Sequence, residues 1–284
     1  MKNFINYIEH LELVDIEEAL KFRVDVSQSL IRSKKNKRLS LDSSQNTIVY
    51  KGSFQKNDIE YDTILSEEPK KDSPESYING NTIQSFVENV SQQAQEDILN
   101  AFLLAQRAAT KIYPNKNDTR LWYDTYFEVL TNIGWTLENN FFQQFACSER
   151  LFEMKKVLLS IMGNIITENG IGIIKKLLET ISDLKDERIQ IFNKRTIKEN
   201  VGCFQLGIAS EQNAVVSVSM GVFFVNAETN INQILLFNTN RQLVTMEYCT
   251  FKATLNYNVF TDETRKMIKS KLGNCSDYIS KLEI

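Results

Sequence analysis

The stretch CFQLGIASEQNAVVSVSMGVFFV, residues 203–225, is where the sequence changes from a helical to a strand-like pattern. Before it, apolar residues recur about every 3.6 positions. From residue 202 onward they alternate, which is the period of a strand. Two later runs, INQILLF at 231–237 and LVTMEYCTFKATL at 243–255, extend the pattern. Short polar links join the four runs, which favours an antiparallel meander.

The rest of the sequence predicts mainly helices. Helical spacing of apolar residues covers the ranges 15–34, 83–112, 118–134, 149–167, 171–184, 261–272 and 275–282, with two short strands at 47–54 and 59–65. Residues 66–80 hold two of the three prolines and many charges, so we expect a flexible loop or linker there. The expected fold is α+β: a single domain over 1–284, with a helical N-terminal and central part packed on a C-terminal antiparallel sheet of four or more strands.

Composition narrows the classes of function. The chain has 284 residues, 42% of them hydrophobic, and a net charge of -3, so it is globular and not a globally basic nucleic-acid binder. The first residues, MKNFINYIEHLELVDIEE, place Glu9 and Glu12 where a secretory signal needs an uncharged apolar run. We therefore expect no signal peptide and a cytoplasmic protein.

Cysteine and histidine limit the chemistry further. Cys147, Cys203, Cys249 and Cys275 form no CxxC pair, and His10 is the single histidine of the chain. A Ser-His-Asp triad, a Cys-His pair or a multi-histidine metal site would have to use that one residue. We expect no metal and no enzyme of these classes.

Cys203 is the strongest candidate for a functional residue. Strand alternation puts Cys203, Gln205 and Gly207 on one face, and Phe204, Leu206 and Ile208 on the other. The small residues on the first face, together with Gly202, are expected to leave room beside the strand. The alternative is that Cys203 is a small buried core residue, as most unpaired cysteines are.

Two other groups of residues suggest lipid. The first is a basic cluster in an otherwise acidic chain, made of Arg32, Lys34, Lys35, Lys37 and Arg38. It could attract anionic lipid headgroups, at about 1 kcal/mol per basic residue. The alternatives are that it binds nucleic acid or that it is a solvated helix end. Four rings in the stretch LWYDTYF, residues 121–127, could line a cavity for an acyl chain or simply form core.

Three segments carry a family resemblance. WYDTYFEVLTNIGW (122–135), VGCFQLGIAS (201–210) and VSMGVFFV (218–225) resemble the family of the Erwinia virulence factor Evf, over roughly residues 85–284. The resemblance implies a compact α/β protein that promotes bacterial persistence in an insect gut and binds lipid vesicles. It also implies a palmitate held as a thioester on one cysteine, with its chain inside the fold, and no established enzymatic activity.

Carried onto this chain, the resemblance makes Cys203 the acylated residue, with Cys249 as the fallback. The residues expected to enclose the acyl chain are Trp122, Tyr126, Phe127 and Phe204. The basic cluster would bind anionic vesicles. Palmitate would be the cofactor, and a host factor of unknown identity would be a further partner. The expected location is the cytoplasm of the producing bacterium, with membrane-associated or released forms as alternatives. The rival interpretation is a cysteine-dependent acyltransferase or thioesterase in which a carboxylate or lysine replaces the missing histidine base.

Overall fold

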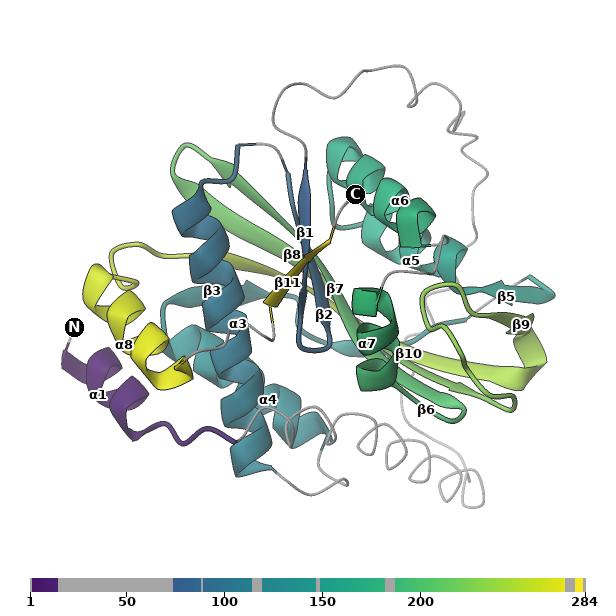
Figure 1. Cartoon of the computed structure of the whole chain (residues 1–284), viewed down its shortest axis with the longest axis horizontal. Helices are drawn as coiled ribbons and strands as arrows, with labels where there is room; N and C mark the ends of the chain where they lie inside the picture. Colours follow the sequence, from purple (N-terminus) through teal and green to yellow (C-terminus); the bar gives the residue numbers. More distant parts are fainter. Residues whose placement is uncertain are drawn as a thin grey trace, which may run out of the picture.

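The computed structural model describes residues 2–14, 74–87, 89–113, 119–146, 149–181, 187–273 and 279–282. Within these ranges a nine-stranded sheet forms the centre of the molecule, in the order β11-β1-β2-β7-β8-β10-β3, with β4 also pairing with β10 and β6 with β7 (Figure 1). Its long strands are β7 (Val201–Gln212), β8 (Val215–Ala227) and β10 (Val244–Leu255). The shorter ones are β1 (Glu75–Asn79), β2 (Thr82–Phe86), β3 (Trp135–Glu138), β4 (Phe142–Gln144), β6 (Ile197–Lys198) and β11 (Ile279–Leu282).

The predicted meander is confirmed for its three long strands. β7 pairs antiparallel with β8 over its full length, and β8 pairs antiparallel with β10. The parallel partner of β7 is β2, with Thr82 opposite Gln205 and Phe86 opposite Ala209. A β1–β2 hairpin from the N-terminal half therefore extends the C-terminal sheet, and β3 and β4 pair with its other long edge strand, β10.

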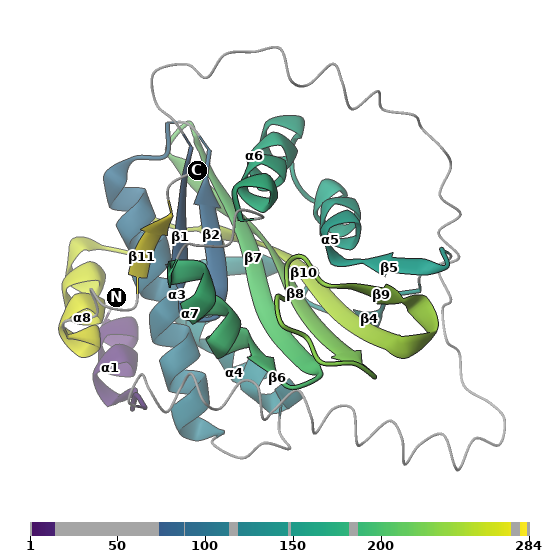
Figure 2. The same cartoon turned by 45° about the vertical axis from the view of Figure 1, so that its right-hand side comes forward.

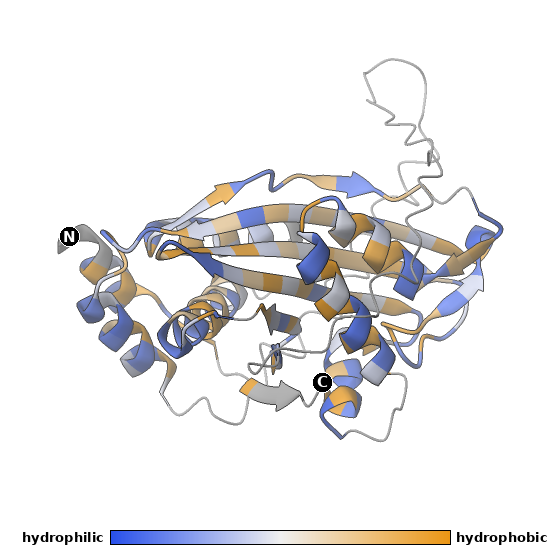
Figure 3. Cartoon of the chain, turned by 90° about the horizontal axis from the view of Figure 1, so that it is seen from above, coloured by the Kyte–Doolittle hydropathy of each residue, from blue (hydrophilic) through white to orange (hydrophobic). Residues whose placement is uncertain are grey.

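Helices cover both faces of the sheet, which confirms the α+β class (Figure 1). On one side lie α3 (Gln92–Ile112) and α4 (Thr119–Asn132), with α1 (Lys2–His10) and α8 (Asp262–Leu272) beyond them. On the other side lie α5 (Met154–Gly163), α6 (Glu168–Thr180) and α7 (Glu187–Thr196), followed by a ribbon of β5 (Leu151–Glu153) and β9 (Asn238–Asn240) and the 3₁₀ turn η3 (Arg241–Leu243). Figure 3 shows the consequence: the sheet strands are rich in hydrophobic residues, whereas the helices carry hydrophilic stretches.

The helix ends follow from local sequence. The Ser91 side chain accepts a hydrogen bond from the Ala94 amide and so caps α3, and Thr261 caps α8 in the same way through the Thr264 amide. Gly273, with φ of 65°, ends α8. These caps fix where α3 and α8 begin.

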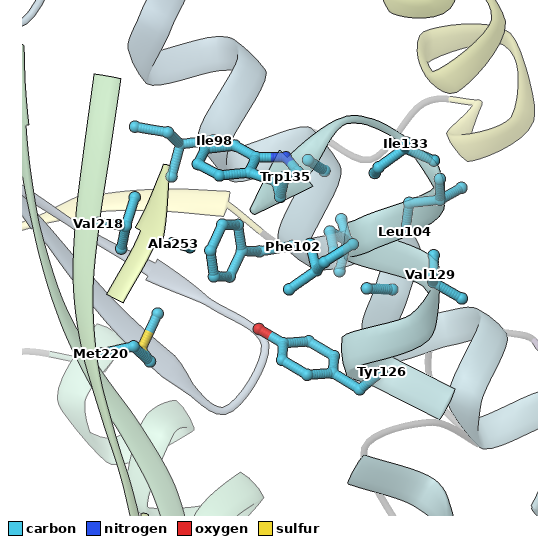
Figure 4. Close-up of a cluster of buried hydrophobic side chains, with 14 of the residues drawn as sticks. Ile98, Phe102, Leu104, Tyr126, Val129, Ile133, Trp135, Val218, Met220 and Ala253 are labelled. Carbon is cyan, nitrogen blue, oxygen red and sulfur yellow. The ribbon is translucent and has the colours of Figure 1, made fainter. Parts of the chain in front are cut away.

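The core between the sheet and the α3–α4 pair is built on aromatic rings. The Phe102 ring of α3 lies between Trp135 and Tyr126, at centroid distances of 5.3 and 6.2 Å, and faces Val218 and Met220 of β8 (Figure 4). Fully burying a large apolar side chain stabilises a fold by about 1.5–3 kcal/mol. This aromatic cluster therefore fixes the helical layer on the sheet.

Several predicted elements are wrong in position or type. The helix predicted at 149–167 covers only Met154–Gly163, because Leu151–Glu153 form β5. Residues 82–86 form β2 rather than the start of a helix, and α3 begins only at Gln92. The run 231–237 is irregular; its Ile231, Ile234 and Leu235 are buried against the sheet. Residues 279–282 form β11 instead of a helix, because they pair with the edge strand β1.

Other predictions fall partly or wholly outside the described residues. The helix 15–34 and the strands 47–54 and 59–65 lie there, as does the part of the predicted loop up to residue 73. The rest of that loop is different from the prediction, since Glu75–Asn79 form β1. The helix α7, which the sequence patterns did not predict, packs on β7.

Candidate functional site

Cys203 is the third residue of β7, which lies between β2 and β8 in the middle of the sheet. It is buried, with 2% of its surface exposed, and it pairs across the strands with Phe224 of β8. Cys249 of β10 is also fully buried, and neither cysteine is part of a disulfide. Both thiols belong to the hydrophobic cluster beneath α3 and α4. We call this side of the sheet the Cys203 face, and the opposite side, defined by Phe204, Leu206 and Ile208, the Phe204 face.

Aromatic rings from α4 close over this part of the Cys203 face. The Phe224 ring lies 5.7 Å from that of Tyr123 and 5.6 Å from that of Phe142. Tyr123 in turn contacts Trp122 at 4.7 Å and Phe127 at 6.0 Å. Three of the predicted enclosing residues, Trp122, Tyr126 and Phe127, therefore lie in the same buried cluster as Cys203.

Phe204, the fourth predicted enclosing residue, lies elsewhere. Its ring stacks on Phe223 at 5.0 Å and meets Phe192 of α7 at 6.4 Å, in the cluster beneath α5–α7. The reason is strand alternation, which turns consecutive side chains of β7 to opposite faces. The structure thus does not bring Phe204 together with the rings near Cys203.

The sequence patterns missed a chain of buried hydrogen bonds next to Cys203. Gln106 of α3 donates to the Thr82 hydroxyl (3.3 Å), and Thr82 donates to the Gln205 side-chain oxygen (2.7 Å). The Gln205 amide donates over a long 3.4 Å to the Tyr123 hydroxyl. These hydrogen bonds thus link α3, β2, β7 and α4 through Gln205, which lies two residues after Cys203. The signal that could have found it is a glutamine inside an otherwise apolar strand, because a buried amide needs partners.

The β1–β2 hairpin beside this chain is polar inside. The side-chain oxygens of Asn79 and Gln84 and the whole side-chain amide of Asn81 are buried, with no hydrogen-bond partner in the part of the chain described. Burying such a group without a partner costs about 1–3 kcal/mol. The helix–sheet contact is therefore stabilised less at the hairpin than at the Phe102 end.

The open space expected at the glycines of β7 is filled. A Cβ on Gly202 would lie 2.3 Å from Ile234 Cδ1, and a Cβ on Gly207 would lie 2.5 Å from Gln84 Oε1 and 2.7 Å from Met220 Cε. These neighbours are the flexible ends of side chains rather than backbone. An acyl chain here would have to take the place of side chains such as that of Met220.

Burial also governs the ionisation of the Cys249 thiol. Burial raises the pKa of Cys249 to about 12, so this thiol stays protonated at neutral pH. The thiolate is the nucleophile in acyl transfer, so Cys249 is poorly suited to react in the folded state. His10 lies exposed on α1, where its Nδ1 contacts the Asn6 carbonyl at 2.7 Å.

Other predicted sites are less defined. The basic cluster from Arg32 to Arg38 lies outside the described residues. Among those that are described, His, Cys, Asp and Glu side chains form no group of three or more that could hold a metal ion. No helix in the same ranges has the length and apolarity needed to cross a bilayer.

Comparison with known proteins gives likenesses of fold at low identity. The sequence matches no protein-family model and no curated protein. Similar solved structures include a delta-endotoxin (13% identity, TM-score 0.40, 76% of this chain and 89% of that one) and the Evf virulence factor (12%, 0.41, 68% and 80%). Activated Cyt2Ba monomer from Bacillus thuringiensis subsp. israelensis is another (11%, 0.40, 63% and 98%). Membership of the Evf-like family stays a prediction.

Proposed function

We propose that this protein is a non-enzymatic virulence factor that interacts with lipid membranes and carries a fatty acyl chain as a thioester on Cys203. The residues that resemble the Evf-like family further suggest a palmitoyl chain and persistence in an insect gut as the biological setting. The single observation that carries the proposal is the meeting of the three resembling segments at one place. Cys203 of β7 lies opposite Phe224 of β8, and Phe224 contacts Tyr123 of α4.

The energetics favour an enclosed chain. Each buried methylene contributes about 0.8 kcal/mol, so a sixteen-carbon chain would contribute on the order of 10 kcal/mol if fully enclosed. Part of this gain is offset by the displaced side chains, of which Met220 is the most adaptable. The acylated protein should therefore be more stable than the unmodified one.

The burial of Cys203 restricts when the acyl group can be attached. At 2% exposure the sulfur is out of reach of an acyl donor in the closed fold. Attachment of the acyl group then requires either an incompletely folded protein or separation of the α3–α4 layer from the sheet near the polar β1–β2 hairpin. We expect palmitoyl-CoA to acylate the protein during refolding and not when it is added to the native, unmodified protein.

The intact mass of the purified protein tests the attachment. We expect an increase of one acyl group, which hydroxylamine removes and Cys203→Ser abolishes. Cys249→Ser is the matched control, because this second buried thiol on the same face should leave the increase unchanged, as should Phe204→Leu on the other face. An unmodified mass from the native producer, or an adduct retained in Cys203→Ser, would refute the assignment.

Two further assays separate the membrane role from catalysis. Co-sedimentation with phosphatidylglycerol vesicles should exceed that with phosphatidylcholine vesicles, and replacing the five basic residues from Arg32 to Arg38 by glutamine should remove the difference. Turnover of acyl-CoA that disappears in Cys203→Ala would instead favour the acyltransferase or thioesterase interpretation. A stable stoichiometric adduct without turnover supports the carrier.

A further inference from the structure

The β1–β2 hairpin differs from the long strands of the sheet in having a largely polar interior. Its buried apolar side chains are those of Ile78, Ile83 and Phe86. Burial of apolar surface is the main source of stability in a fold, so the hairpin gains less from being buried than β7, β8 and β10 do. The polar side chains buried in it, each with an exposed fraction of 0–1%, are those of Ser76, Asn79, Asn81, Thr82, Gln84 and Ser85.

Several of these buried polar groups lack a hydrogen-bond partner. Asn79 Nδ2 donates to the Leu99 carbonyl of α3, and Gln84 Nε2 donates to the Ser85 carbonyl, both at 2.9 Å. The side-chain oxygens of Asn79 and Gln84, and both polar atoms of the Asn81 side chain, have no partner among the described residues. A buried polar atom without a partner destabilises the structure that encloses it, and contact with water removes that penalty.

The hairpin is also joined to the rest of the sheet over a short length. β2 pairs with β7 over the five residues Thr82–Phe86, whereas β8 pairs with all twelve residues of β7. On its other side the hairpin holds only β11, and Figure 2 shows β11, β1 and β2 side by side at one margin of the sheet, next to β7. These three strands can therefore leave β7 without breaking any pairing among β7, β8 and β10.

We propose that β1, β2 and β11 form a unit that opens away from β7 while the long strands stay folded. The opening breaks the hydrogen bond from the Gln205 amide to the Asn81 carbonyl, 2.9 Å long in the closed form, and brings water to the buried amide groups. It uncovers the edge of β7 from Gln205 to Ala209, and an uncovered strand edge can pair with another extended chain. Cys203 stays covered by the rings from α4, so the opening does not depend on acylation.

Native-state hydrogen exchange of the full-length protein, followed by mass spectrometry of its peptides, tests the proposal. We expect amides of residues 75–86 to exchange at least tenfold faster than those of β8 and β10, after correction for their intrinsic rates. Low urea concentrations should accelerate exchange in the hairpin less than in β8 and β10, because a local opening exposes less surface than global unfolding. The same pattern is expected in Cys203→Ser, which makes the result independent of any acyl group.

Asn81→Leu tests the cause of the opening, since it removes two buried polar atoms that have no partner. It should slow exchange in residues 75–86 about tenfold and raise the urea midpoint. Gln212→Leu is the matched control, because it replaces an exposed amide of β7 outside the pairing with β2, and it should leave exchange in the hairpin unchanged.

Two results would overturn the proposal. One is exchange in the hairpin at the same rate, and with the same dependence on urea, as in β8 and β10. The other is faster exchange in the hairpin of Asn81→Leu than in that of the unmodified protein. The first measurement uses the unmodified chain, so it decides the question even if Asn81→Leu does not fold.

Discussion

The hydrogen bond between Thr82 and Gln205 should be a principal link between the N-terminal hairpin and the C-terminal sheet. It joins β2 to β7 at 2.7 Å, and both residues are buried, with 1% and 0% of their surfaces exposed. Gln205→Leu removes the acceptor and leaves the Thr82 hydroxyl buried with the Gln106 donor as its remaining neighbour in this chain. A buried polar group deprived of its partner costs about 1–3 kcal/mol, so we expect a loss of this size in the free energy of unfolding.

Thr82→Val should cost a similar amount, because it takes the donor from Gln205 and the acceptor from Gln106. In the double variant the two deprived groups no longer face each other, so its cost should be less than the sum of the two single costs. We expect a coupling of about 0.5–3 kcal/mol, the range for residues in one hydrogen-bond network.

Urea unfolding followed by circular dichroism at equal protein concentration measures all four proteins of this cycle. Equal slopes with denaturant would show that the same surface is exposed in each, so that the free energies can be compared. Additive costs, within about 0.3 kcal/mol, would refute the claim that the two side chains interact and with it the role given to the buried chain.

Two other predictions concern buried ionisable groups. Burial raises the pKa of Cys249 to about 12, against 9.0 for an ordinary thiol, so the stability that the buried, protonated thiol contributes is complete below pH 9 and is lost as the pH rises toward 12. The urea midpoint should therefore fall less between pH 8 and 11.5 in Cys249→Ala than in the unmodified protein. Equal falls in the two proteins would contradict this role of the thiol. Asp97 of α3 accepts from Arg265 Nε of α8 at 2.8 and 2.9 Å and is 2% exposed, so Asp97→Asn should cost about 2–3 kcal/mol, discounted for the partly exposed arginine. Lys269→Ala, which breaks an exposed pair between the same helices, should cost under about 1 kcal/mol, and thermal unfolding that ranks the two variants the other way would refute the difference.

Parts of the site could be predicted from the sequence because they depend on local geometry. Alternation along β7 correctly separated Cys203, Gln205 and Gly207 from Phe204, Leu206 and Ile208. The same alternation shows why Phe204 could not join Trp122, Tyr126 and Phe127 at the cysteine. The acyl attachment itself, which comes from a resemblance between segments, stays a prediction.

Other parts could not be predicted, because they depend on contacts between distant segments. All five residues of β2 are buried, so the strand shows no alternation, and the spacing of Ile83, Phe86 and Val90 fits a helix equally well. The Ile234 side chain occupies the space beside Gly202. It belongs to residues 231–237, which have a strand-like pattern in the sequence but are irregular in the structure. Phe152 of β5, Arg241 of η3 and Met246 of β10 come together with Phe145, which follows β4, and no spacing in the sequence marks this grouping.

The sequence by itself determined the change from helical to strand period at residue 202 and the three long antiparallel strands. These depend on side-chain periodicity, which acts within a few residues. Only the tertiary structure decided that a parallel β2 joins the sheet, that rings of α4 close over Cys203, and that the glycines of β7 are filled from elsewhere. Burial on both faces removes the polar half of a strand pattern, and packing between remote segments has no period that a sequence can display.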